Sequence, residues 1–141
     1  MVVDDDYDDL ALFSEALMIV RPEAIFGMAE NGTDAVQYLN THGAKRPAII
    51  FLDINMPGMN GWSCISELKS SPVYNDIPVV IYTTSSTKAD QEKASQLGAL
   101  CFVSKMPDFK SLKKMLEIVV QNLEKNTVHF ICSDIHKLAV M

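Results

Sequence analysis

Short apolar runs that each end in a chemically reactive side chain recur along this chain. The clearest is residues 48–52 (AIIFL), which Asp53 follows directly. Apolar stretches of this length are typical of parallel strands that are buried on both faces of a sheet. Open α/β sheets bind their ligands outside the carboxyl ends of the strands, so the side chains that follow the runs mark the expected site. Four such side chains are those of Asp4, Asp53, Thr83 and Lys105.

Segments with helical spacing separate these runs. Residues 8–20 place apolar side chains three and four positions apart, and Pro22 closes the segment. Strands that alternate with helices predict an α/β fold with a parallel sheet covered on both sides. The expected strands are 1–3, 24–29, 48–52, 79–82 and 100–104, and the expected helices are 8–20, a segment after the turn at 31–33, 61–69, 87–97 (with Thr87 as its cap) and 109–123.

Composition narrows the class of protein. A chain of 141 residues has the size of one ordinary domain, and none of its apolar stretches approaches the roughly 20 residues needed to span a bilayer. The first residues lack the features of a secretory signal, and the three cysteines are too few and scattered for a disulfide framework, so a soluble cytoplasmic protein is expected. The three histidines show no metal-ligand spacing with these cysteines. A net charge of −6 argues against nucleic-acid binding.

Three aspartates are expected to gather at neighbouring strand ends. Asp4, Asp5 and Asp53 would repel one another there unless a cation neutralised them, and Mg²⁺ prefers oxygen ligands of this kind together with phosphoryl oxygens. The ammonium of Lys105 and the hydroxyl of Thr83 suit contacts with a phosphoryl group. The pattern therefore predicts a site for an aspartyl phosphate, with Asp53 as the nucleophile.

In order and spacing, the motifs that carry this chemistry resemble those of the receiver domains of two-component response regulators. The resemblance covers residues 1–125, and it leaves residues 126–141 as a C-terminal tail of unknown role. It implies a flavodoxin-like (βα)5 fold whose five-stranded parallel sheet has the strand order 2-1-3-4-5. The motifs are residues 2–6 (VVDDD), 51–61 (FLDINMPGMNG), 78–83 (PVVIYT) and 102–105 (FVSK).

The resemblance also implies roles for single residues. A histidine kinase or a histidine phosphotransfer protein would donate a phosphoryl group to Asp53. Asp5 and Asp53 would bind Mg²⁺ directly, and Asp4 would bind it through a water molecule. The main-chain carbonyl of Asn55 would complete the protein ligands.

The remaining implied roles belong to the response to phosphorylation. Lys105 would pair with the phosphoryl group, and Thr83 would move toward it. Phe102 occupies the place of the family's switch aromatic and would turn inward as Thr83 moves. The output would be a change in contacts with a downstream protein rather than an enzymatic reaction beyond self-phosphorylation and autodephosphorylation. Residues 70–78 and 83–85 are similar to single-domain receivers that act with phytochrome-like kinases.

Three features depart from the family pattern. The usual Lys-Pro pair reads Lys105-Met106-Pro107 here, which puts the family's cis peptide bond in question, since a cis bond before a residue other than proline costs about 2.5–4 kcal/mol. The first strand has only three residues before Asp4 and could be an incomplete start. In the tail, residues 128–132 suit a sixth strand and residues 135–140 a helical turn or two.

Two alternatives to a phosphorylated signalling module remain open at this point. One is a pseudo-receiver that keeps the fold without the switch. The other is a phosphohydrolase of the haloacid-dehalogenase type, against which Asn55 stands, because those enzymes place a second aspartate two residues after the nucleophile. The cognate kinase, the output partner, the lifetime of the phosphorylated state and any homodimer also stay open.

Overall fold

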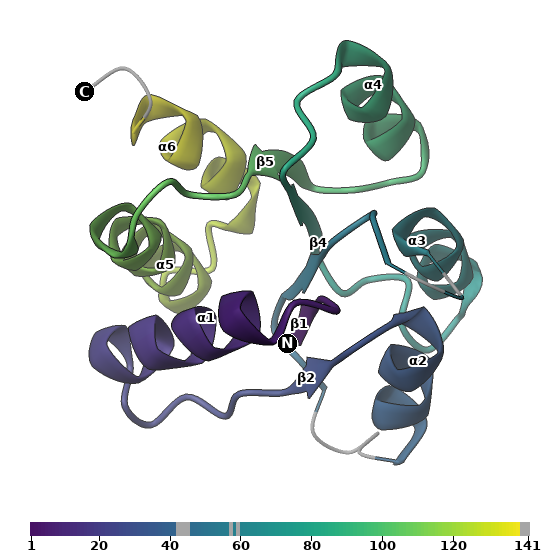
Figure 1. The fold of residues 1–141 in the computed structure, drawn as a ribbon, viewed down its shortest axis with the longest axis horizontal. Helices are drawn as coiled ribbons and strands as arrows, with labels where there is room; N and C mark the ends of the chain where they lie inside the picture. The colour runs from purple at the N-terminus through teal and green to yellow at the C-terminus, as the bar shows by residue number, and fades with distance from the viewer. Residues whose placement is uncertain (42–45, 57, 59, 139–141) are drawn as a thin grey trace. The chain divides into compact units, whose positions relative to one another are not determined.

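Strands and helices alternate along the chain as the sequence predicts (Figure 1). The computed structural model describes residues 1–41, 46–56, 58 and 60–138. Its contacts divide the chain into two units, the first made of residues 1–7 and 27–105 and the second of residues 8–26 and 106–141. The elements are β1 (Val2–Val3), α1 (Tyr7–Val20), β2 (Met28–Ala29), α2 (Gly32–Thr41), β3 (Ile50–Leu52), α3 (Gly61–Ser70), β4 (Val79–Thr83), α4 (Lys88–Gln96), β5 (Cys101–Ser104), α5 (Phe109–Glu124), the 3-10 helix η1 (Val128–Phe130) and α6 (Ile131–Leu138).

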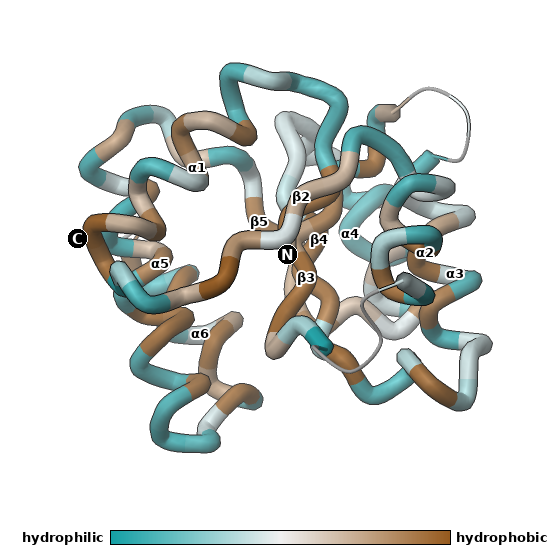
Figure 2. Tube along the Cα trace, turned by 90° about the horizontal axis from the view of Figure 1, so that it is seen from below, coloured by the Kyte–Doolittle hydropathy of each residue, from teal (hydrophilic) through white to brown (hydrophobic). Residues whose placement is uncertain are grey.

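The first unit contains a five-stranded sheet in the order β2-β1-β3-β4-β5. Every pairing between neighbouring strands is parallel. The predicted flavodoxin-like class and its strand order, 2-1-3-4-5, are therefore confirmed. Figure 2 shows how apolar the strands are, most evidently β3 and β4, which is the pattern expected of strands buried on both faces.

The core of the first unit forms where side chains of the sheet meet those of α2 and α3. Contacts join these two helices, and Leu39 of α2 and Ile65 of α3 are both buried. The sheet contributes fully buried residues such as Leu52 and Ile81. Trp62 and Phe102 are partly buried at the margin of the same cluster. Apolar burial thus holds the three central strands, whose carboxyl ends carry Asp4, Asp53 and Thr83 of the expected site.

Local capping explains where α3 and α4 begin and end. The Asn60 side chain accepts a hydrogen bond from the Ser63 N–H at the start of α3, and Thr87 accepts one from the Asp90 N–H at the start of α4. The predicted cap at Thr87 is therefore confirmed. After α4, Gly98 takes a φ of 92°, a left-handed conformation that suits glycine and ends the helix.

Strand two is shorter than predicted. Only Met28 and Ala29 pair with β1, whereas the expected strand was 24–29. The chain first makes a turn in which the Ala24 N–H donates to the Arg21 carbonyl, and Phe26 packs near the ring of Phe13, with 6.1 Å between ring centroids. The apolar run therefore serves two purposes, a ring contact in the second unit and a short strand in the first.

In the second unit, the predicted sixth strand at residues 128–132 is wrong. Helix α5 ends in a Schellman motif, in which the Thr127 N–H bonds the Asn122 carbonyl and the Asn126 N–H bonds the Leu123 carbonyl. Asn126 has a φ of 57°. The chain then continues as η1 and α6. The predicted helical segment 135–140 is part of α6 as far as Leu138, and its last two residues lie outside the described part of the chain.

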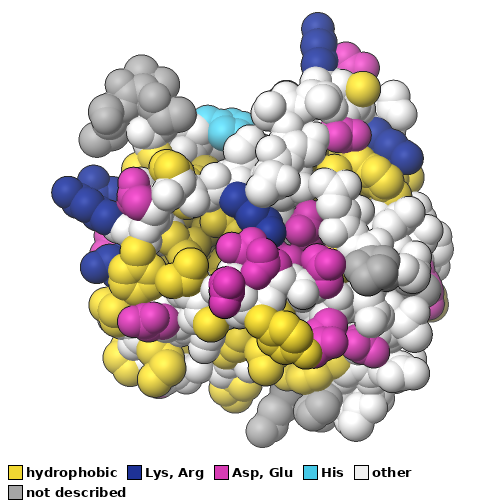
Figure 3. Space-filling view, in the orientation of Figure 1, with side chains coloured by type: hydrophobic (Ala, Val, Ile, Leu, Met, Phe, Trp, Pro, Cys, Tyr) yellow, Lys and Arg dark blue, Asp and Glu magenta, His cyan; other side chains and the backbone are white. Residues whose placement is uncertain are grey.

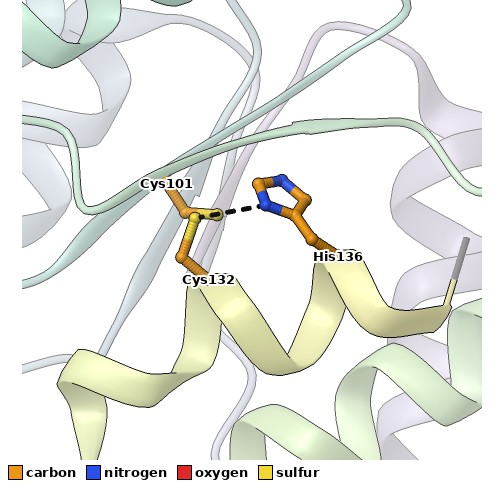
Figure 4. A group of neighbouring side chains, drawn as sticks. All are labelled: Cys101, Cys132 and His136. Atoms are coloured by element: carbon orange, nitrogen blue, oxygen red, sulfur yellow. Dashed lines mark hydrogen bonds between the residues drawn. The ribbon is translucent and has the colours of Figure 1, made fainter.

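The buried side chain of Asn122 joins the parts of this C-terminal segment. Its amide donates to the Ile118 carbonyl and to the Asp134 carboxylate, and its oxygen accepts from the Thr127 hydroxyl at 2.7 Å. On α6, Cys132 and His136 lie one turn apart, with 3.8 Å between Sγ and Nδ1 (Figure 4). The expectation that no histidine has a ligand-like spacing to a cysteine is therefore wrong for this pair.

The described ranges contain no helix that is both long and apolar enough to cross a membrane.

Candidate functional site

Asp4 and Asp53 come together because of the register between β1 and β3. Val3 lies opposite Leu52, and each is followed by one of the two aspartates. The β1–β3 pairing continues for one further step, since the Asp53 N–H donates to the Val3 carbonyl, and on the other side of β1 the Asp4 N–H donates to the Ala29 carbonyl of β2. Both carboxylates are buried, with residue exposures of 2% for Asp4 and 6% for Asp53. Two acidic side chains therefore stand side by side where two central strands end.

The same local turn orients both carboxylates. Oδ1 of Asp4 accepts the N–H of Asp6 at 3.0 Å, and Oδ1 of Asp53 accepts the N–H of Asn55 at 3.1 Å. An aspartate that bonds the backbone two residues further on stabilises a turn and restricts its own side chain. In both residues this leaves Oδ2 as the oxygen directed at other partners.

Lys105 supplies the partner for both Oδ2 atoms. It follows the last residue of β5, and its N–H donates to the Thr83 carbonyl, so the β4–β5 pairing sets its position. Its Nζ lies 2.7 Å from Oδ2 of Asp4 and 3.2 Å from Oδ2 of Asp53. The predicted grouping of an amine with strand-end carboxylates is thus present in the structure.

The electrostatics of this group are unbalanced. Burial raises the pKa of Asp4 because it penalises the charged form, and the Lys105 ammonium acts in the opposite direction. One ammonium faces the carboxylates of Asp4 and Asp53, and the exposed carboxylate of Asp5 lies close by. Figure 3 shows acidic side chains gathered beside a basic one on this face of the molecule. The site therefore carries an excess of negative charge that favours an added cation.

The donor set fits a hard divalent cation. Asp4, Asp5 and Asp53 each offer one carboxylate oxygen, and these three atoms lie within 4.8 Å of one another. A site whose ligands are a few carboxylate oxygens suits Mg²⁺ better than it suits metals that favour nitrogen or sulfur. Asp5 is exposed, so a hydrated ion has access to the carboxylates from solvent.

Thr83 is the last residue of β4 and is fully buried. It pairs with Ser104, the residue before Lys105, and its Oγ1 accepts the N–H of Ser85 at 3.5 Å. Its hydroxyl is therefore in contact with the loop that leads into α4. Phe102 is partly buried against the core cluster of the first unit.

The question about the Lys105–Met106 peptide has a clear answer. Within the described part of the chain every peptide bond is trans, including this one. The short first strand is present as Val2–Val3, which pairs on both sides. Pro57 and Met59, which belong to the motif after Asp53, lie outside the described residues.

Gly61 is a residue of the site whose importance the sequence reasoning missed. A Cβ at this position would lie 2.3 Å from the Asp53 carbonyl oxygen and 2.5 Å from Cα of Ile54. The Gly61 N–H also donates to the Ile54 carbonyl. Only glycine lets the start of α3 approach the backbone of Asp53 so closely. The signal in the sequence was a glycine directly before a predicted helix and after the turn that follows Asp53.

Comparison with known proteins agrees with this geometry. The family model described as "Response regulator receiver domain" matches residues 1–117. Response regulator Rcp1 of Synechocystis sp. is 30% identical over 121 residues, which are 83% of this chain and 82% of Rcp1. A probable cyclic di-GMP phosphodiesterase of Vibrio cholerae is 32% identical over 124 residues, but this chain spans only 26% of its length.

Solved structures of response regulators also match this chain. The phosphorylated cyanobacterial phytochrome response regulator RcpA matches with a TM-score of 0.79 and 28% identity, over 89% of this chain and 92% of RcpA. The Mn²⁺-bound form of Rcp1 matches with a TM-score of 0.68 and 28% identity, over 84% of this chain and 88% of that one. The chain belongs to the response regulator receiver domain family of two-component signalling.

Proposed function

We propose that this protein is a receiver that accepts a phosphoryl group on Asp53 and signals through a change in its protein contacts. The observation that carries the proposal is the meeting of a buried Asp53 with Asp4, Asp5 and the Lys105 ammonium at the carboxyl ends of the strands. The phosphodonor would be a phosphohistidine of a histidine kinase or of a phosphotransfer protein.

The transfer itself needs little from the protein besides position and charge. A carboxylate oxygen of Asp53 forms a bond to phosphorus while the bond from phosphorus to the donor nitrogen breaks, and the electron pair stays on the imidazole. Oδ2 is the candidate oxygen, because Oδ1 already accepts the N–H of Asn55. The Lys105 ammonium lies within hydrogen-bonding distance of that oxygen, and after transfer it would bind an oxygen of the phosphoryl group.

Asp5 and Asp53 would hold Mg²⁺ directly, with Asp4 acting through a water molecule and the Asn55 carbonyl as a further ligand. When bound, the ion supplies positive charge against the phosphoryl oxygens. The support in this chain is the close group of three carboxylate oxygens, two of whose residues pair with the Lys105 ammonium. Asp4 would serve both as a partner of Lys105 and as the outer ligand.

The response would spread from Thr83 and Phe102. A phosphoryl group adds about −1.5 to −2 charge units with strong acceptor oxygens, enough to bias a loop between two arrangements. Thr83 would turn toward it and Phe102 would turn inward. Residues 1–125 would form the receiver, since α5 ends at Glu124 with Lys125 as its cap, and residues 126–141 would form an added C-terminal segment. The output partner would be a protein that recognises the altered surface.

Intact-mass spectrometry after incubation with acetyl phosphate tests this proposal. Wild type should gain the mass of one phosphoryl group when Mg²⁺ is present and should not gain it in EDTA. Asp53→Asn should gain nothing, whereas Asp76→Asn, the same chemical change at an exposed ion pair with Arg46, should behave as wild type. A folded wild type that binds Mg²⁺ and stays unmodified would favour a pseudo-receiver instead.

A further inference from the structure

The first turn of α4 sends a carboxylate back into the loop that precedes it. Asp90 is the third residue of the helix, and its N–H donates to the Thr87 hydroxyl at 3.2 Å. In a capping box, the side chain at this position returns to the N–H of the cap residue itself. Here the Asp90 carboxylate reaches further and accepts the hydroxyl of Ser85. The Ser85–Asp90 contact therefore ties the loop to the helix, beside the cap that Thr87 provides.

Ser85 is also the loop residue in contact with the proposed phosphorylation machinery. Its N–H donates to Oγ1 of the buried Thr83 at 3.5 Å. Its carbonyl accepts the hydroxyl of Ser104, the residue before Lys105, at 3.5 Å. Both contacts are long for hydrogen bonds and are individually weak. The strong member of the group is the bond from the Ser85 hydroxyl to an ionised carboxylate.

Apolar packing does little to hold α4 in place. Ala94 is the one buried residue among the nine of this helix. The ammonium of Lys93 lies 4.8 Å from the ring centroid of Trp62 on α3. Polar contacts therefore decide much of where the start of α4 lies, and the Ser85–Asp90 contact is the one that reaches toward Thr83.

We propose that Asp90 is a positioning residue that acts through Ser85 to favour the arrangement of the loop in which the Thr83 hydroxyl is engaged by the Ser85 N–H. This inference rests on the proposed function, in which Thr83 turns toward a phosphoryl group on Asp53. The turn requires the loop to rearrange, and the Ser85–Asp90 contact opposes that rearrangement. The carboxylate thus lowers the fraction of protein that is ready to respond.

The inference predicts a gain of function when the contact is removed. When only part of a protein is in the competent arrangement, its apparent affinity for a ligand falls in proportion to that part. Asp90→Ala should therefore bind a phosphoryl analogue about 3- to 10-fold more tightly than wild type, the range expected for one net hydrogen bond at a partly exposed site. A variant that was merely less stable would not bind more tightly.

The experiment is a titration of the full chain with beryllofluoride in the presence of Mg²⁺. Binding is measured by the fluorescence of Trp62, the single tryptophan of the chain, which lies at the start of α3. Glu92→Ala is the matched control, because it removes one negative charge from an exposed position on the same helix. Ser85→Ala removes the hydroxyl but keeps the N–H, and it should reproduce the gain of Asp90→Ala. The double variant should show no further gain, because both changes break the same contact.

The outcomes separate the inference from the function on which it rests. Tighter binding by Asp90→Ala and Ser85→Ala, with Glu92→Ala equal to wild type, would support the inference. Equal or weaker binding by Asp90→Ala would overturn it while leaving the proposed function intact. An equal gain in Glu92→Ala would assign the effect to net charge, and an additive double variant would show that Asp90 does not act through Ser85. A folded wild type that binds no beryllofluoride would overturn the proposed function itself, and this inference with it.

Discussion

Gly61→Ala should damage both the stability of the protein and the acceptor site. The added Cβ would stand 2.3 Å from the Asp53 carbonyl oxygen, 2.5 Å from Cα of Ile54 and 3.0 Å from the Asp53 carbonyl carbon. All three atoms belong to the backbone, so no side-chain rotation relieves the overlap. The start of α3 and the turn after β3 must separate by about 1 Å to reach an ordinary contact distance.

The size of the effect follows from two losses. Forced overpacking costs about 1–3 kcal/mol, and separation of the two segments also breaks the bond from the Gly61 N–H to the Ile54 carbonyl, worth about 1 kcal/mol. The free energy of unfolding should therefore fall by about 2–4 kcal/mol. For a chain of this length the midpoint of thermal unfolding should drop by about 6–12 °C. Because the backbone of Asp53 moves, phosphoryl uptake should slow by about 10- to 100-fold.

Urea unfolding, followed by circular dichroism, and the rate of modification by acetyl phosphate measure the two effects. Gly58→Ala is the control, since a Cβ there meets nothing within 4 Å and only the φ of 70° is unfavourable. It should cost about 1–2 kcal/mol and should leave the acceptor rate near that of wild type. If Gly61→Ala matched Gly58→Ala in both stability and rate, the close approach of α3 to Asp53 would not exist in solution.

Three further perturbations test other parts of the structure. Lys105→Met leaves the buried carboxylates of Asp4 and Asp53 without the Lys105 ammonium, so the free energy of unfolding, measured with urea in EDTA, should fall by about 3 kcal/mol. Mg²⁺ should stabilise this variant more than wild type, and an equal effect of Mg²⁺ on both would contradict the ion-pair assignment. Burial raises the pKa of the Cys64 thiol to about 12, so an alkylating reagent at pH 9 should modify Cys64 only after the protein unfolds, as peptide mass mapping would show. Rapid alkylation of Cys64 in the native protein would refute its burial. Asn126→Val should lower the free energy of unfolding, measured by thermal denaturation, by about 1–2 kcal/mol, because a β-branched residue is strained in the left-handed conformation at the end of α5. Asn126→Gly should be neutral or stabilising, and equal stability of the two variants would argue against the Schellman motif.

The site residues that directly follow a strand were predictable from the sequence, because ligands bind at the carboxyl ends of parallel strands. Asp4, Asp53, Thr83 and Lys105 each follow an apolar run, and a parallel sheet brings such positions to one edge. The structure gathers the two aspartates with Lys105 in the expected way. The prediction of these four site residues stays correct even when the predicted ends of a strand are wrong by a residue or two, because each residue lies at or just after the end of its strand.

Contacts that depend on how the backbone turns were not predictable. No pattern shows that Oδ1 of Asp53 is engaged by Asn55 and that Oδ2 is left for Lys105. The approach of Gly61 to Asp53 depends on the path of an irregular loop, and the bond between Ser85 and Asp90 depends on the geometry of a helix cap. These details come from loop conformation, which periodicity does not encode.

The failures in secondary structure have a common cause. Residues 24–29 and 128–132 are both mainly apolar segments of strand length, and short segments of this kind do not distinguish a strand from other structures. In the first, the contact between the rings of Phe26 and Phe13 leaves only Met28 and Ala29 for the sheet. In the second, the turn at Asn126 leads the chain into a helix.

The most direct test of the central claim is to locate the phosphoryl group chemically. Reduction of an aspartyl phosphate with borohydride converts the modified residue to homoserine, which peptide mass spectrometry places in the sequence. After treatment with acetyl phosphate and Mg²⁺, we expect this conversion at Asp53 and at none of the neighbouring aspartates Asp4, Asp5 and Asp6. Conversion at one of those three in place of Asp53, or no conversion in a folded protein that binds Mg²⁺, would contradict the account.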